Sequence, residues 1–152
     1  MSESNRAQAA FEFVSYFALF LLVFVVGVAY ITSTEVREIR QREDSLAREL
    51  AFGMASEIHF AARAGGGYER MVIVPKRIGA SEYAVYIKGG FLTLNWSRGE
   101  EVREVVAPLS TSSVATQTLA VVDGYIVVNA SNGYVKLATR TLPTGDVVYV
   151  DQ

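Results

Sequence analysis

Residues 6–31 read RAQAAFEFVSYFALFLLVFVVGVAYI, and they place one carboxylate, Glu12, at the head of an uncharged apolar run. The run, from Phe13 to Ile31, is rich in Phe, Leu, Val and Ala and is long enough to cross a hydrocarbon core of about 30 Å as a helix. A soluble domain of this chain's size has too little interior to hide a helix that is apolar on every side. The run therefore predicts a transmembrane helix at about residues 13–31.

The composition limits the classes of function. The chain has 152 residues and a formal net charge of −2, so charge gives no reason to expect nucleic acid as a partner. It has no cysteine, which excludes disulfides and thiolate metal sites, and its single histidine, His59, is too few for a histidine metal cluster. We expect no metal and no cofactor.

Motifs for catalysis are not found either. Glu57 and His59 are two positions apart on an expected helix, so they do not face each other. The glycines at 65–67 follow that helix, whereas a phosphate-binding loop must open one. We expect no catalytic residue and no enzymatic activity.

The apolar run is expected to stay in the mature protein, because no Ala-x-Ala cleavage site follows Ile31. A short polar leader precedes it, and Arg6, Ala7 and Gln8 follow, with Glu12 one helical turn further on. This pattern resembles the class III signal peptide of archaeal type IV pilin-like proteins, whose leader ends in a basic residue and Gly or Ala just before a Gln.

The resemblance implies removal of a leader at residues 1–7 by a membrane prepilin peptidase that recognises Arg6 and cuts between Ala7 and Gln8. It also implies a pilus assembly ATPase and platform as partners. The protein would lie in the cytoplasmic membrane, with its N-terminus inside and its C-terminus outside, before it enters a cell-surface filament.

Cleavage before Gln8 would create an α-amino group, mostly cationic at neutral pH, one turn from Glu12. In a bundle of such helices, the Glu12 carboxylate of one subunit could meet the Gln8 amine of the next, which would offset the desolvation of both charges and set the axial register. Alternatively, Glu12 is a solvated residue at the headgroup level with no role in assembly.

Two observations bear on the orientation in opposite senses. Arg6 alone precedes the apolar run, whereas Arg37, Arg40 and Arg42 follow it, and this count favours a cytoplasmic C-terminal part. N-glycosylation sequons begin at Asn95 and Asn129, which favours an extracellular one. The resemblance decides for the second orientation.

Beyond the apolar run, residues 35–50 lack Gly and Pro, so the helix is expected to continue as part of one long helix at 8–64. Its second half is amphipathic and is expected to pack on a domain. The expected apolar stripe contains Val36, Ile39, Leu46, Leu50, Met54 and Ile58.

From Tyr68 onward the apolar period changes to two, which predicts a β-rich domain at residues 68–152. The resemblance implies that this domain is extracellular. Strands are predicted at 71–74, 83–87, 91–94, 102–106, 119–122, 125–128, 134–137 and 147–150, and a loop at 108–118. Hairpins are predicted at the Gly89-Gly90 turn and near Asn132-Gly133. The fold class is thus α+β, a long N-terminal helix packed on a small antiparallel β domain, as in pilins.

Two functions follow. The first is a structural subunit of an archaeal type IV pilus-like filament, which associates with copies of itself through the N-terminal helix and serves in adhesion. The second is a single-span envelope protein that does not polymerise and whose outer β domain binds a surface layer or a motility filament.

Overall fold

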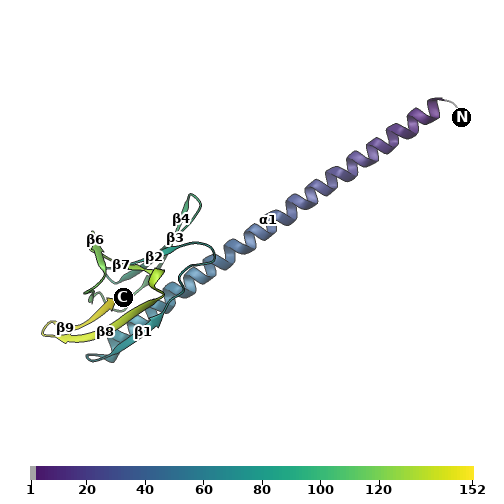
Figure 1. The fold of residues 1–152 in the computed structure, drawn as a ribbon. Helices are drawn as coiled ribbons and strands as arrows, with labels where there is room; N and C mark the ends of the chain where they lie inside the picture. The colour runs from purple at the N-terminus through teal and green to yellow at the C-terminus, as the bar shows by residue number, and fades with distance from the viewer. Residues whose placement is uncertain (1–2) are drawn as a thin grey trace. The chain divides into compact units, whose positions relative to one another are not determined.

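The computed structural model describes residues 3–152, without the side chains of residues 3–7 and 9. It is an α+β protein with one long helix, α1 (Glu3–Ala64), followed by nine strands and one 3₁₀ helix, η1 (Ala130–Asn132) (Figure 1). The chain divides into two units at Arg42 and Glu43, so α1 contributes to both. Of the predicted leader, residues 1–2 lie outside the described part. The helix begins at Glu3, earlier than the leader boundary.

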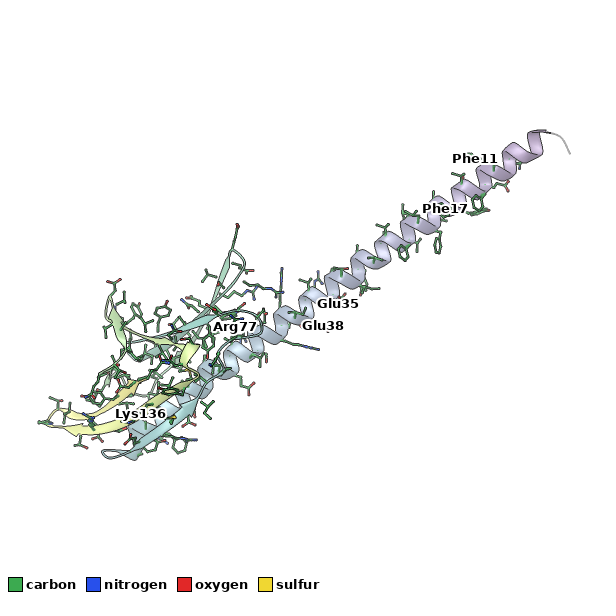
Figure 2. The ribbon with its side chains drawn as sticks, viewed as in Figure 1. Phe11, Phe17, Glu35, Glu38, Arg77 and Lys136 are labelled. Carbon is green, nitrogen blue, oxygen red and sulfur yellow. The ribbon has the colours of Figure 1, made fainter. Side chains whose placement is uncertain are left out.

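The first unit consists of helix alone, and its apolar run has no cover. None of the apolar window is buried, and this helix is long and apolar enough to cross a membrane. Phe11 and Phe17 are 73% and 56% exposed, and their side chains project from the helix (Figure 2). The ring of Phe17 stacks on that of Phe13, one turn away on the same helix. In water this surface would be costly, because apolar area contributes about 25 cal/mol per Å² when it is buried.

The second unit contains the end of α1 and two sheets. The four-stranded sheet has the order β1 (Glu69–Ile73), β8 (Tyr134–Leu142), β9 (Gly145–Asp151) and β5 (Val114–Ala115). The five-stranded sheet has the order β4 (Glu101–Pro108), β3 (Phe91–Arg98), β2 (Tyr83–Lys88), β7 (Tyr125–Asn129) and β6 (Ala120–Val122). All neighbouring strands are antiparallel except β5 and β9, which run parallel. The predicted loop at 108–118 is therefore wrong in part, because β5 forms inside it.

The predicted Gly-Gly hairpin is confirmed. Lys88 pairs with Phe91, which leaves Gly89 and Gly90 as a two-residue loop between β2 and β3. Their φ angles are 59° and 85°, and such positive values at both loop positions match the twist of the flanking strands.

The predicted hairpin near Asn132-Gly133 is wrong. β7 pairs with β2 and β6, whereas β8 pairs with β1 and β9, so the two strands belong to different sheets. A turn does form at this position, since Gly133 follows η1 with a left-handed φ of 77°. That turn carries the chain from one sheet to the other instead of folding it back.

The helix packs on the sheets through a stripe of small residues. Ala47, Ala51, Ala55 and Ala61 are at most 5% exposed and lie in the core with Ile58. Small side chains let the helix backbone lie close to the strands, which explains the choice of alanine.

The predicted apolar stripe on α1 is therefore only partly right. Met54 and Ile58 are buried and Leu50 packs at the edge of the core, but Val36, Ile39 and Leu46 are 37%, 48% and 49% exposed. The buried apolar stripe starts only at Ala47, because alanines repeat there at helical spacing.

Polar contacts fix the helix on the sheets at both ends of the second unit. Near Arg42, the carboxylates of Glu43 and Asp44 pair with Arg98 and Arg103 of β3 and β4, at 3.1 and 2.7 Å. At the other end, the buried hydroxyl of Thr139 donates a hydrogen bond of 2.7 Å to the carbonyl of Ala61.

Candidate functional site

The residues predicted to direct processing and assembly lie at the start of α1. Gln8 and Glu12 are both exposed, and the side-chain amide of Gln8 donates a hydrogen bond of 3.2 Å to a Glu12 oxygen. The α1 backbone includes Arg6 and Ala7, but their side chains lie outside the described part. Gln8 thus reaches Glu12 from one turn away, as expected from their spacing.

The two sequon asparagines have different surroundings. Asn129 is exposed at the end of β7, and its side-chain oxygen caps η1 by accepting a hydrogen bond of 3.0 Å from the Ser131 N–H. Asn95 is half-buried in the middle of β3, between Ala84 and Glu104 of the neighbouring strands. Its buried Oδ1 has no hydrogen-bond partner among the residues that the structure describes. Asn129 is the more accessible acceptor.

Glu57 and His59, which were considered above for catalysis and metal binding, both lie on α1. Glu57 forms an ion pair of 2.8 Å with Arg70 of β1, and His59 is half-buried on α1. Among the described residues, no three potential metal-binding side chains come together.

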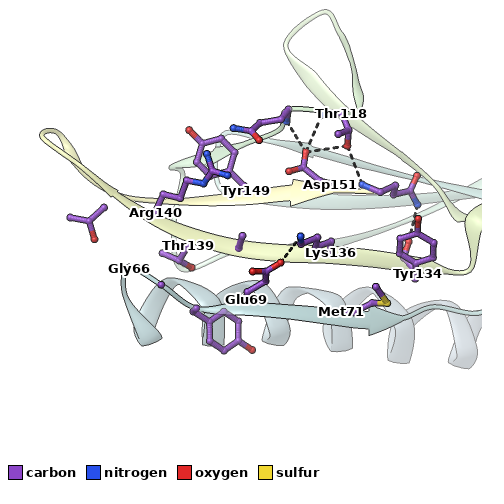
Figure 3. A pocket seen from close by; sticks show the side chains of 16 residues that line it. Gly66, Glu69, Met71, Thr118, Tyr134, Lys136, Thr139, Arg140, Tyr149 and Asp151 are labelled. Atoms are coloured by element: carbon purple, nitrogen blue, oxygen red, sulfur yellow. Dashed lines mark hydrogen bonds and ion pairs between the residues drawn. The ribbon is translucent and has the colours of Figure 1, made fainter.

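A hollow of about 830 Å³ lies on the outer face of the four-stranded sheet (Figure 3). The strand register explains its shape, because Ala138 of β8 lies opposite Glu69 of β1 on one side and Tyr149 of β9 on the other. Along β8 the next side chains on this face are Lys136 and Arg140. A methyl group surrounded by four long side chains leaves a depression, and we call it the β8 hollow, formed by Glu69, Lys136, Ala138, Arg140, Tyr149 and Asp151.

The charges of the β8 hollow are held in place. Lys136 forms an ion pair with Glu69, drawn as a dashed line in Figure 3, and this hydrogen bond and charge lower the pKa of the Glu69 carboxyl. Arg140 lies over the ring of Tyr149 with its guanidinium carbon 5.1 Å from the ring centre, close enough for a cation–π contact.

Asp151 anchors the segment that borders the β8 hollow. Its Oδ1 accepts hydrogen bonds from the Thr116 hydroxyl, the Gln117 N–H, and both the N–H and the hydroxyl of Thr118, at 2.6–3.2 Å. Burial raises the pKa of the Asp151 carboxyl, but these bonds outweigh it, and the net pKa lies below the ordinary value. Asp151 is therefore a fixed, ionised acceptor at neutral pH.

Sequence reasoning missed the β8 hollow. Its residues come from β1, β8 and β9, which are distant in sequence except for the β8–β9 hairpin. One signal was available, since Tyr134, Lys136, Ala138 and Arg140 alternate with buried residues and must share the outer face of one strand.

Comparisons with known proteins identify no relative. No protein-family model matches the chain, no curated protein matches it, and no solved structure matches it.

Proposed function

We propose that this chain is a structural subunit of an archaeal type IV pilus-like surface filament. A prepilin peptidase would remove residues 1–7, and the subunit would wait in the cytoplasmic membrane with its C-terminal domain outside. An assembly ATPase and platform would then bring copies together through the apolar part of α1. The β domain would coat the filament and supply adhesive contacts.

The observation that carries the proposal is the uncovered apolar run of α1 with Glu12 at its head. Nothing in the described part of the chain buries this run, so lipid or other copies must do so. A simple anchor has no need of a carboxylate there, and an ionisable group in a membrane segment costs at least a few kcal/mol on insertion scales. A role in assembly accounts for both features.

The contact between Gln8 and Glu12 supports the charge pairing. The side-chain amide of Gln8 lies within hydrogen-bonding reach of this carboxylate, so residue 8 and Glu12 are neighbours on one face of α1. After cleavage, residue 8 would carry a cationic amine as well as its amide, so each carboxylate in a bundle would have a cation available from its own or a neighbouring chain. A slip in axial register would leave charges unpaired in an apolar surrounding, which favours one register.

The test is a comparison of Glu12→Gln with Glu38→Gln in the native cells. Both changes remove one carboxylate from an exposed position on α1, but only Glu12 lies at the head of the apolar run (Glu38 is labelled in Figure 2). We expect Glu12→Gln to be inserted and processed but absent from sheared surface filaments. Glu38→Gln should assemble as the unchanged chain does.

The alternative, an envelope protein that does not polymerise, predicts a different result. In that case no filament contains the chain, and both variants remain in the membrane fraction in equal amount. If Glu12→Gln assembles into filaments normally, the chain is a filament subunit, but the proposed charge pair is not needed for its assembly.

A further inference from the structure

The β8 hollow retains hydrogen-bonding capacity that the protein itself does not use. All four bonds to Asp151 go to Oδ1, and its Oδ2 accepts none from the described residues. Within the same part of the chain, the Arg140 guanidinium has only the ring of Tyr149 as its partner. An acceptor and a set of donors are thus left free on the two sides of one depression.

These free groups select among ligand chemistries. A phosphate or carboxylate only accepts hydrogen bonds, and an ammonium group only donates them, whereas a hydroxyl does both. The β8 hollow also contains two cations, Lys136 and Arg140, and two carboxylates, Glu69 and Asp151, so its formal charges cancel. A ligand with several hydroxyls and no net charge meets both conditions.

The aromatic side chains add an apolar surface. Tyr149 and Tyr134 line the cavity from β9 and β8, and Met71 lines it from β1 (Figure 3). The C–H face of a pyranose ring can lie on such side chains while its hydroxyls reach the charged groups. The volume of about 830 Å³ is within the range of small-molecule sites, roughly 300–1,000 Å³.

We propose that the β8 hollow binds an uncharged oligosaccharide. Its hydroxyls would accept from the Arg140 guanidinium and donate to Asp151 Oδ2, with one sugar ring over Ala138 beside Tyr149. The loop at 116–118 would act through Asp151, whose position it fixes. The site belongs to the β domain alone, so it stands whether or not the chain forms filaments.

The test uses the full chain in lipid nanodiscs, prepared without N-linked glycans, on an array of neutral, sialylated and sulfated oligosaccharides. We expect binding to neutral members of the array. Ala138→Leu should fill the β8 hollow, and Ala120→Leu makes the same change on exposed β6 as a matched control. Because the leucine of Ala138→Leu keeps the sugar away from the charged side chains, the hydrogen bonds to them are lost and binding should weaken about tenfold or more. The Ala120→Leu control should bind normally.

Arg140→Gln is a second variant, because Arg140 is exposed and its replacement leaves the core untouched. It should also weaken binding to neutral oligosaccharides. The proposal is overturned if no neutral oligosaccharide binds, if only sialylated or sulfated ones bind, or if both Ala138→Leu and Arg140→Gln bind as the unchanged chain does. Filament assembly is measured separately, so its failure would not be confused with any of these results.

Discussion

The apolar run at 13–31 and the end of α1 at 43–64 differ in the size of their apolar side chains and in how far these are buried. The first carries large side chains on all sides, and none of them is buried by the described residues. The second turns a stripe of alanines to the sheets, and these alanines are at most 5% exposed. Large side chains suit a surface that another molecule must cover, whereas alanines suit a close contact already made within the chain.

The largest expected effect comes from exchanging these strategies. Ala51→Leu would force a larger side chain into the contact between α1 and the sheets, where Ala51 is fully buried. We expect the free energy of unfolding of the β domain to fall by about 1–3 kcal/mol, as for overpacked cores. Ala18→Leu, the same change in the uncovered run, should leave it unchanged.

Both variants can be followed in detergent by the fluorescence of Trp96, the only tryptophan, which is 4% exposed in the core. Equal stability of Ala51→Leu and Ala18→Leu would contradict the close packing of the alanine stripe.

A smaller loss is expected when the ion pairs near Arg42 are weakened. Glu43 is 7% exposed and pairs with Arg98, so Glu43→Gln leaves a guanidinium without its charge partner. Because Arg98 is partly solvated, the cost should be about 1–2 kcal/mol, below that of a fully buried pair. Urea unfolding measures it, and Glu38→Gln serves as the matched surface change. Equal free energies of unfolding for Glu43→Gln and Glu38→Gln would mean that the Glu43–Arg98 pair does not contribute to stability.

Thr139→Val should cost about 1 kcal/mol, since it removes the buried hydrogen bond from the Thr139 hydroxyl to the Ala61 carbonyl. Thr32→Val removes a similar hydroxyl, which bonds to the Val28 carbonyl on the exposed part of α1. Thermal unfolding of the β domain should respond to the first change only. An equal change in melting temperature for both variants would show that the Thr139 hydrogen bond does not stabilise the contact between the end of α1 and β8.

The smallest effect depends on pH. The pKa of Asp151 is lower in the folded chain than its ordinary value of 3.8, so the unfolded chain binds its proton more readily. Its contribution to stability is present above that value and is lost as the pH falls through the folded pKa. Asp151→Asn should therefore differ from the unchanged chain in melting temperature at about pH 6 and less at about pH 3. A constant difference would contradict the role of the carboxylate.

Much of the fold could be predicted because local patterns determine it. The uncharged run predicts the helix, alternation predicts most strands, and Gly89-Gly90 specifies a turn with two positive φ angles. The placement of β7 and β8 in different sheets could not be predicted in the same way. A turn at Gly133 is compatible with either a hairpin or a crossing between sheets, and the choice depends on partners far away in sequence.

The site was less predictable than the fold. Glu12 is visible in the sequence because a charge beside an apolar run is conspicuous. The β8 hollow depends on register, since Ala138 becomes a floor only when Glu69 and Tyr149 lie opposite it. The anchoring of Asp151 depends on the parallel pairing of β5 with β9, in a segment that composition alone predicts to be a loop.

The central claim, that the uncovered run serves in assembly after processing, is tested most directly by the N-terminal mass of the chain from native cells, including filaments sheared from their surface. The account predicts a chain that begins at Gln8 with a free amine and is found in the sheared fraction. A chain that begins at Met1 and stays in the membrane fraction would contradict it. Cleavage followed by cyclisation of Gln8 would confirm processing but remove the cation proposed to meet Glu12.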